Sequence, residues 1–211
     1  WRPENDGGKF YGPTRLRWAL TKSRNLVSIR ILQKMGVKEM LRYAGTLGFK
    51  TDEFAPDLSL ALGTHAMAPM DIAKAYAILA NGGYQVEPIL IERIEKADGA
   101  LMYQAEPLLA CDPCNNAQTA QAELSMADIL AGTSKVKKAP RVMDERIHFI
   151  LDSMLKDVIR LGTGRKALLL NRDDIAGKTG TTNGPRDAWF AGYNPKVVTT
   201  AWVGFDDFSE L

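Results

Sequence analysis

The chain of 211 residues is long enough for one large domain or two small ones with a buried core. Hydrophobic residues make up 45% and charged residues 25%, an ordinary globular composition that argues against disorder. With 27 basic and 25 acidic residues, no basic stripe indicates nucleic acid, and no apolar run of 18 residues indicates a membrane span. No signal-peptide pattern opens the chain at Trp1, and we expect both ends to be cut from a longer protein.

The first third of the chain has helical spacing. The pattern predicts a helix, a short break and a second helix over 13–35, and a third helix over about 37–46. The break falls at Ser23-Arg24-Asn25, where serine and asparagine favour caps because their side chains bond nearby backbone groups. A further helix is predicted over 71–81, with Asp71 as its cap and glycines at its end.

The middle of the chain has a turn and a loop-rich part. Ala97-Asp98-Gly99, between two apolar runs, predicts a β-hairpin. Residues 105–140, rich in Ala, Asn, Gln, Pro and Lys, predict a loop-rich insertion. Helical spacing resumes over 144–161 and closes at Gly162, with an apolar face expected from Ile147, Ile150, Met154 and Val158.

The last third predicts three strands, over 174–182, 188–193 and 197–205, with a turn at Asn194-Pro195 between the final two. Helices therefore come first and an antiparallel run of strands last. The fold class is α/β in the broad sense, more narrowly α+β, with an antiparallel sheet flanked by helices.

Cysteine and histidine give little support for a metal or a cofactor. Cys111 and Cys114 form a lone CxxC, without the second pair or the histidines that a structural zinc site needs. Their loop-like flanks do not suit a redox centre, which leaves two reduced thiols or, in an oxidising compartment, a local disulfide. His65 and His148 have no second ligand at metal-site spacing. We predict neither metal nor cofactor.

A strand with unusual chemistry covers Ile175–Thr182. Alternation places Lys178 and Gly180 on one face, with Thr179 and Thr181 on the other. A phosphate-binding P-loop is excluded, since it needs a further glycine where Arg172 stands. A cation, paired hydroxyls and a glycine that lets another backbone approach suit an extended peptide ending in a carboxylate. A solvated edge strand with an incidental lysine fits the segment equally well.

A second glycine pattern is Gly162-Thr163-Gly164, which with Ala167 fits a loose dinucleotide-binding motif. That motif needs a preceding strand, and here a predicted helix precedes it. We reject dinucleotide binding.

Ser23-Arg24-Asn25, followed much later by Lys178-Thr179-Gly180, resembles the SxN and KTG motifs of penicillin-binding proteins and class A β-lactamases. Four longer stretches of sequence make the resemblance more specific: Ser23–Arg30, Gly63–Met70, Gly177–Gly184 and Asp187–Tyr193. They resemble bifunctional class A penicillin-binding proteins of the 1A type. This resemblance covers nearly the whole chain. The resemblance implies the fold of penicillin-binding transpeptidases and serine β-lactamases. Residues 1–211 would be the C-terminal portion of such a domain, lacking its N-terminal part.

The reaction that the resemblance implies is peptidoglycan cross-linking through a covalent serine ester. A serine attacks the D-Ala-D-Ala amide of a stem peptide, D-alanine leaves, and the amine of a second stem takes the acyl group. Ser23 would relay a proton to the leaving nitrogen, Asn25 would hold the acyl-side amide, and a charged Lys178 would orient Ser23.

The same resemblance implies the substrate-binding residues. The hydroxyls of Thr179 and Thr181 would bind the terminal carboxylate, and the backbone N–H of Thr181 would be one oxyanion donor. Gly180 would leave room for the substrate strand, and Thr182 is the fourth residue assigned to substrate binding. β-Lactam antibiotics would inhibit by forming a slowly hydrolysed acyl-enzyme.

The nucleophile of this family lies in an SxxK motif upstream of SxN. The two SxxK strings here, Ser134–Lys137 and Ser153–Lys156, both follow SxN. We interpret them as chance matches, the first in a lysine-rich loop and the second pointing to solvent. The serine is expected before Trp1, in an N-terminal remainder of the same protein.

The complete protein would then be a bifunctional enzyme at the periplasmic face of the bacterial inner membrane, with a glycosyltransferase domain and a membrane anchor outside this chain.

Three alternatives to this function stay open. The first is a class A β-lactamase, which needs a deacylating glutamate such as Glu87 or Glu106. The second is a β-lactam sensor or scaffold of the same fold, and the third is one part of a nicked enzyme, inert until it pairs with its N-terminal piece.

Overall fold

A computed structural model gives the fold and describes residues 1–110, 137–182, 184–207 and 209–211. Its main α-helices are α1 (Leu16–Thr21), α2 (Asn25–Met35), α3 (Val37–Thr46), α4 (Pro69–Ala80) and α7 (Glu145–Leu161). The strands are β1 (Arg93–Glu95), β2 (Leu101–Gln104), β3 (Ala176–Thr181), β4 (Asp187–Tyr193) and β5 (Val198–Gly204). Short 3-10 turns, which the sequence did not predict, include η2 (Thr51–Glu53), η3 (Leu58–Leu62) and η4 (Arg165–Leu170).

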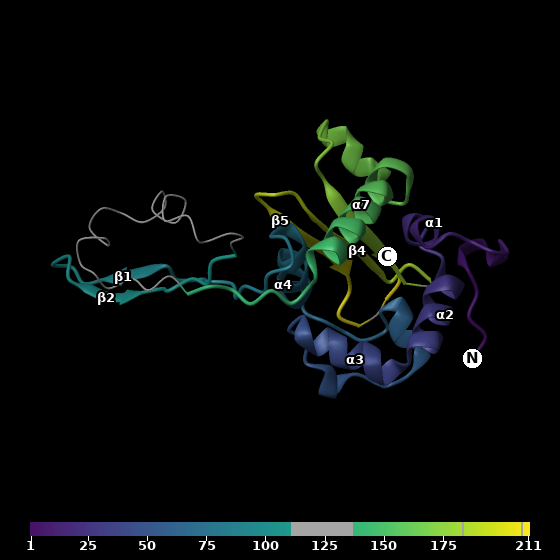
Figure 1. The fold of residues 1–211 in the computed structure, drawn as a ribbon, viewed down its shortest axis with the longest axis horizontal. Coiled ribbons are helices and arrows are strands. Elements are labelled where there is room, and N and C mark those ends of the chain that lie inside the picture. The colour runs from purple at the N-terminus through teal and green to yellow at the C-terminus, as the bar shows by residue number, and fades with distance from the viewer. Residues whose placement is uncertain (111–136, 183, 208) are drawn as a thin grey trace.

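The main sheet is antiparallel, in the order β3-β4-β5. Its register pairs Ala176 with Tyr193 and Lys178 with Ala191, so these four side chains share one face. On the other face the ring of Phe190 covers two glycines: a Cβ on Gly177 would lie 3.0 Å from the Phe190 Cζ, and one on Gly192 2.7 Å from its Cε1. Because only hydrogen fits there, these glycines let the ring lie against the sheet. Strands β4 and β5 of this sheet are labelled in Figure 1.

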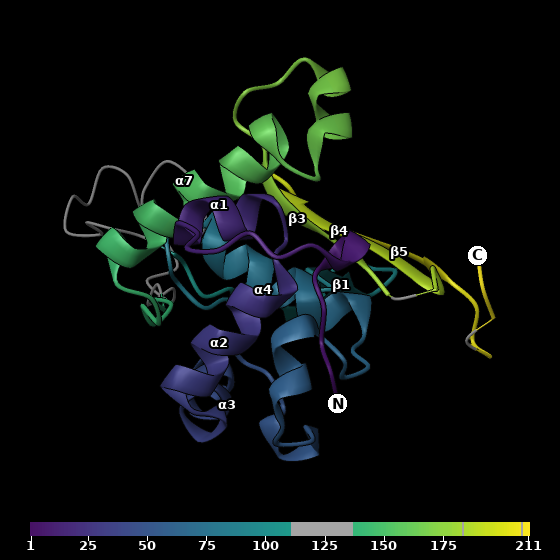
Figure 2. The ribbon, with the colours of Figure 1, turned by 90° about the vertical axis from the view of Figure 1, so that its right-hand side faces the viewer.

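Helices α4 and α7 pack on one face of this sheet (Figure 2). The core there is built around three buried side chains, Leu155, Ala176 and Tyr193. The Tyr193 hydroxyl donates to Asp152 Oδ1 at 2.9 Å, and burial, followed by the Asp152 charge, raises the pKa of Tyr193. The arrangement confirms the predicted α+β class with an antiparallel sheet flanked by helices.

The predicted break in the first helical region lies between α1 and α2, and the third helix has its expected bounds. The predicted cap of α4 is wrong: Asp71 lies in the first turn and Ala68 is the N-cap, since Pro69 begins the helix. The predicted hairpin is present as β1 and β2, with Asp98 Oδ1 accepting a bond from Ala100 N–H at 2.9 Å.

The hairpin extends away from the helices and the main sheet (Figure 1). Of the expected insertion at 105–140, residues 111–136 lie outside the described part, and with them Cys111, Cys114 and Ser134. Its two described flanks meet at a bridge between Leu109 and Lys138, and Tyr84 bridges to Arg141. The insertion therefore leaves and rejoins the domain at one place.

The predicted apolar face of α7 needs correction. Met154 and Val158 are buried as expected, but Ile147 and Ile150 are more than half exposed, while Leu155 and Ile159 are buried. The half-buried His148 lies on the inner side, with Nε2 2.6 Å from the Leu79 carbonyl oxygen. The face is thus rotated, because the helix packs on both α4 and the sheet.

Candidate active site

The turn between α1 and α2 carries the first motif in a constrained backbone conformation. Ser23 has φ 52°, in the left-handed region that a non-glycine residue rarely adopts. Two backbone bonds hold it there, from Ser23 N–H to the Leu20 carbonyl at 3.1 Å and from Arg24 N–H to the Ala19 carbonyl at 2.9 Å. The exposed Ser23 side chain is thereby aimed at a defined point rather than left in a mobile loop.

Lys178 reaches this turn from the main sheet. Its Nζ donates to Ser23 Oγ at 2.9 Å and to the Thr179 carbonyl at 2.8 Å. The side chain leaves β3 on the face covered by helices, and this burial lowers the pKa of Lys178 to about 8. The two motifs, 155 residues apart, therefore meet as the resemblance implied.

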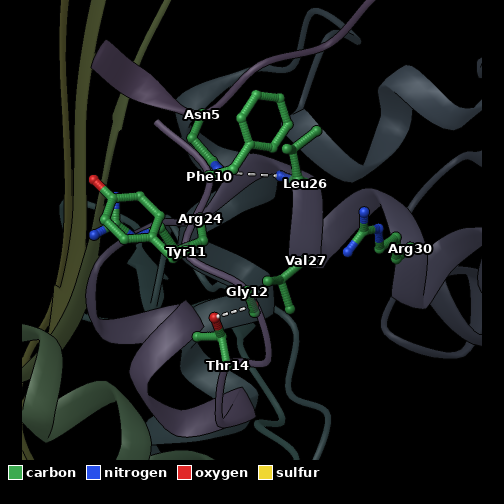
Figure 3. Close-up of a pocket in the computed structure, with 9 residues that line it drawn as sticks. All are labelled: Asn5, Phe10, Tyr11, Gly12, Thr14, Arg24, Leu26, Val27 and Arg30. Atoms are coloured by element: carbon green, nitrogen blue, oxygen red, sulfur yellow. Dashed lines mark hydrogen bonds between the residues drawn. The ribbon is translucent and has the colours of Figure 1, made fainter. Parts of the chain in front are cut away.

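Asn25, the third motif residue of this turn, begins α2 and is half-buried. Its Nδ2 donates to the Glu4 carbonyl at 2.9 Å, which leaves the Oδ1 of the carboxamide to accept a bond from elsewhere. The buried Asn5 side chain caps the same helix end, since its Oδ1 accepts from Leu26 N–H at 3.2 Å (Figure 3). The N-terminal segment thus fixes both the helix start and the Asn25 rotamer.

A cavity of about 190 Å³ lies beside this turn. Figure 3 shows the residues that line it. The Arg24 guanidinium stacks on the Tyr11 ring, with Cζ 3.4 Å from the ring centroid. Arg24, the variable residue of the motif, therefore ties the turn to the N-terminal segment.

The second motif lies on β3, at one edge of the main sheet. The other side of this strand has no hydrogen-bonded neighbour among the described residues, so its backbone is open to an extended peptide. The exposed Thr181 side chain makes no hydrogen bond within that described part. Gly180 has only one close neighbour, with Trp189 Cβ 3.3 Å from the position of a Cβ. A substrate strand can therefore approach this edge.

Thr182 has a structural role that its assignment to substrate binding did not anticipate. Its Oγ1 accepts bonds from Arg186 N–H at 3.1 Å and from Asp187 N–H at 2.9 Å. Asp187 in turn accepts from Trp202 Nε1 at 2.9 Å. Thr182 thus closes the β3–β4 connection, and only its hydroxyl hydrogen is left for another partner.

Sequence reasoning missed Thr163 as a site residue. Its Oγ1 lies 2.6 Å from Thr179 Oγ1. As a sequence pattern, Gly162-Thr163-Gly164 matches only the dinucleotide-binding motif rejected above, and the structure confirms that it follows a helix, α7. The signal that could have identified Thr163 is a hydroxyl side chain between two glycines, shortly before a strand that itself carries the hydroxyls of Thr179 and Thr181.

The SxxK string within the described part is occupied by other contacts. Ser153 Oγ accepts from Arg17 Nη1 at 3.0 Å, and Lys156 Nζ pairs with Asp152 Oδ2 at 2.9 Å. Both side chains are half-buried, so the expectation that they point to solvent is wrong. Each is nevertheless engaged away from the other, which does not suit a serine activated by a lysine.

The described residues hold no group of three or more His, Cys, Asp or Glu side chains arranged for a metal ion. His65 packs on Phe54, with ring centroids 4.2 Å apart. In the same part of the chain, no helix has the length and apolarity needed to cross a bilayer.

Comparison with known proteins shows the family of this chain. The family model described as the penicillin binding protein transpeptidase domain matches residues 2–205. The chain belongs to this transpeptidase family. Its curated relatives include proteins named penicillin-binding protein 1A: one from Pseudomonas aeruginosa is 46% identical over 98% of this chain, and one from Neisseria cinerea is 43% identical over the same share.

Solved structures give the same fold. Penicillin-binding protein 1A from Haemophilus influenzae superposes with a TM-score of 0.85 at 35% identity, covering 99% of this chain and 32% of that one. The PonA1 protein from Mycobacterium tuberculosis, in complex with penicillin V, gives 0.70 at 21% identity, over 98% of this chain and 52% of that one, and shows the fold alone. The chain spans 28% of the Pseudomonas relative and 23% of the Neisseria one.

Proposed function

We propose that this chain is the C-terminal portion of a serine-type peptidoglycan D,D-transpeptidase that cross-links stem peptides and is inhibited by β-lactams. The observation that carries the proposal is the 2.9 Å contact between Lys178 Nζ and Ser23 Oγ, beside an open strand edge. A hydroxyl bonded to a buried amine is able to pass a proton, which suits acyl transfer.

In this proposal the nucleophilic serine and its lysine come from the N-terminal remainder of the same protein. The serine Oγ attacks the carbonyl carbon of the D-Ala-D-Ala bond, and Ser23 relays the serine proton to the nitrogen of the departing D-alanine. The amine of a second stem then attacks the ester, forming the cross-link and releasing the serine. The free Oδ1 of Asn25 accepts the acyl-side amide N–H of the substrate.

The terminal carboxylate binds to the hydroxyls of Thr179 and Thr181, while Gly180 and the remaining hydrogen of the Thr182 hydroxyl line the same edge. The backbone N–H of Thr181 is one donor to the oxyanion, and losing one such donor costs roughly 2.7–4 kcal/mol of transition-state stabilisation. Lys178, charged below its pKa of about 8, supplies the positive potential that a carboxylate needs.

The proposal is tested on the full-length protein with a fluorescent penicillin. We expect Ser23→Ala and Lys178→Ala each to lower the acylation rate about a hundredfold or more, since general acid–base groups contribute about 10²–10⁴-fold. Ser28→Ala and Lys38→Ala are matched controls on exposed positions of α2 and α3, and should label normally. Normal labelling of both site variants would disprove the roles assigned here.

Two related functions are separated by product analysis. A β-lactamase would turn over nitrocefin, and a β-lactam sensor would acylate without joining stem peptides. The candidate deacylating glutamates do not suit the former: Glu87 pairs with Lys74 at 2.7 Å and Glu106 with Lys137 at 2.6 Å, both exposed. Cross-linked stem dimers are therefore the product that we expect.

For the whole protein we propose a second activity, peptidoglycan glycosyl transfer, and a place at the periplasmic face of the inner membrane, with the anchor outside this chain. The support is the similarity to longer relatives named penicillin-binding protein 1A. Fractionation of cells and a lipid II polymerisation assay on the full-length protein test these two points.

A further inference from the structure

The loop Gly162-Thr163-Gly164 joins the two halves of the site. On one side, Thr163 Oγ1 lies 2.6 Å from Thr179 Oγ1 on β3. On the other, the residue just before the loop contacts the turn that carries Ser23: Lys22 Nζ donates to the carbonyl of Leu161, the last residue of α7, at 2.7 Å. No other described side chain makes a hydrogen bond to the Thr179 hydroxyl.

Both glycines hold this loop in close contact with neighbouring atoms, which at Gly162 are backbone oxygens. A Cβ on Gly162 would lie 2.2 Å from the Thr21 carbonyl oxygen and 2.7 Å from that of Val158. A Cβ on Gly164 would lie 2.8 Å from Ile159 Cδ1. The N–H groups of Gly162 and Gly164 both donate to the Val158 carbonyl at 3.1 Å. Because backbone atoms on both sides limit its movement, the loop presents Thr163 to β3 at a fixed position.

We propose that Thr163 is a positioning residue that sets the direction of the Thr179 hydroxyl toward a carboxylate. Two hydroxyls at 2.6 Å share one hydrogen, and in the free site either oxygen is able to donate it. A carboxylate accepts only, so Thr179 must donate to it, and its own oxygen is then free to accept from Thr163. Thr163 thereby leaves the Thr179 hydrogen to the substrate and polarises it.

This role predicts selectivity for acids. In a ligand whose carboxylate is converted to an ester, the oxygen facing Thr179 is a weaker hydrogen-bond acceptor. Alignment of the Thr179 hydroxyl therefore adds little to the binding of such a ligand. A residue that only kept the loop folded would affect acid and ester alike. The ratio of the two rates therefore separates positioning from a structural role.

The inference rests on the proposed function, and its test uses the full-length protein with a penicillin and the methyl ester of the same penicillin. We expect Thr163→Val to lower the acylation rate constant for the acid about three- to tenfold, as for a lost neutral hydrogen bond, and to leave that for the ester unchanged. Thr163→Ser should restore the acid rate, because it returns the hydroxyl.

Thr46→Val is the matched control, since it removes an exposed hydroxyl that donates to Tyr43 O within α3. Unchanged acid rates in Thr163→Val would overturn the inference while leaving the proposed function intact, and so would equal losses for acid and ester. A wild-type protein that no penicillin acylates would overturn the proposed function and this inference together. Melting temperatures of all variants identify any loss due to unfolding.

Discussion

At the scale of single residues, Lys178 shows how the surroundings of a side chain change its pKa and its reactivity. A lysine on an exposed strand would stay fully charged, yet here the helix-covered face of the sheet buries most of the side chain and lowers the pKa to about 8 from 10.5. Its two hydrogen bonds, to Ser23 and to the Thr179 carbonyl, then fix the amine where a charge or a proton is useful. The residue is therefore poised to lose its charge just above neutral pH.

This environment predicts a basic limb in the pH profile of the full-length protein. Because burial favours the neutral amine, Lys178 is charged below about pH 8 and loses its charge as the pH rises through that value. We expect acylation by carboxylate-bearing penicillins to fall above about pH 8, measured by stopped-flow fluorescence. The matched control is Lys178→Arg, whose permanent charge should flatten the limb even if the overall rate drops. A wild-type rate that is constant up to pH 10 would contradict the assignment.

At the scale of elements, close packing of backbones aligns the site. The ends of α1 and α7 come from distant parts of the sequence and meet at Gly162, where no side chain fits beside the Thr21 carbonyl. The next residue, Thr163, contacts strand β3. Phe190 uses Gly177 and Gly192 in the same way within the sheet. In each of these contacts, the absence of a glycine side chain lets neighbouring groups approach closely and fixes the distance between them.

Gly162→Ala should therefore destabilise the protein. The new methyl group would lie within 3 Å of two backbone oxygens, which are unable to move as a side chain does, so we expect a loss of about 1–3 kcal/mol or more in the free energy of unfolding. Gly45→Ala is the matched control: it lies within α3, its nearest neighbour is 3.7 Å away, and it should gain up to about 1 kcal/mol from helix propensity. Urea unfolding of both variants measures the difference, and equal stabilities would refute the close approach.

At the scale of the whole molecule, much apolar surface lies uncovered. Ile147, Phe149 and Ile150 on α7 are each more than half exposed, and Trp18 on α1 is 45% exposed. This chain matches 28% of the length of one relative and 23% of the length of the other. We propose that the N-terminal remainder covers part of this surface and brings the nucleophile to Ser23 and Lys178.

This chain alone is accordingly expected to take no covalent β-lactam. Intact mass spectrometry after incubation with penicillin should show the unmodified mass, while the full-length protein gains one acyl group under the same conditions. Adding the N-terminal piece to the chain and running a native gel tests whether the two parts assemble. An adduct on Ser153 or Ser134 would show that the SxxK matches here were wrongly set aside.

Helices, strands and their order followed from the sequence, because apolar spacing and turn residues act locally. The break at Ser23–Asn25, the Asp-Gly hairpin and the three final strands are each encoded within a few residues. The resemblance of the motifs was also enough to predict that Ser23 and Lys178 meet. Local patterns did not predict which side of α7 is buried. Whether Ile147 and His148 are buried depends on the elements that pack against the helix, and apolar spacing alone does not contain this information.

What the sequence by itself determined is thus the set of elements and the chemical groups that they carry. Only the tertiary structure decided how those groups are used: the depressed pKa of Lys178, the closing role of Thr182 and the pairing of Thr163 with Thr179. The physical reason is that burial, hydrogen-bond distance and backbone contact depend on which segments pack together. Residues far apart in a chain acquire these properties only once it has folded.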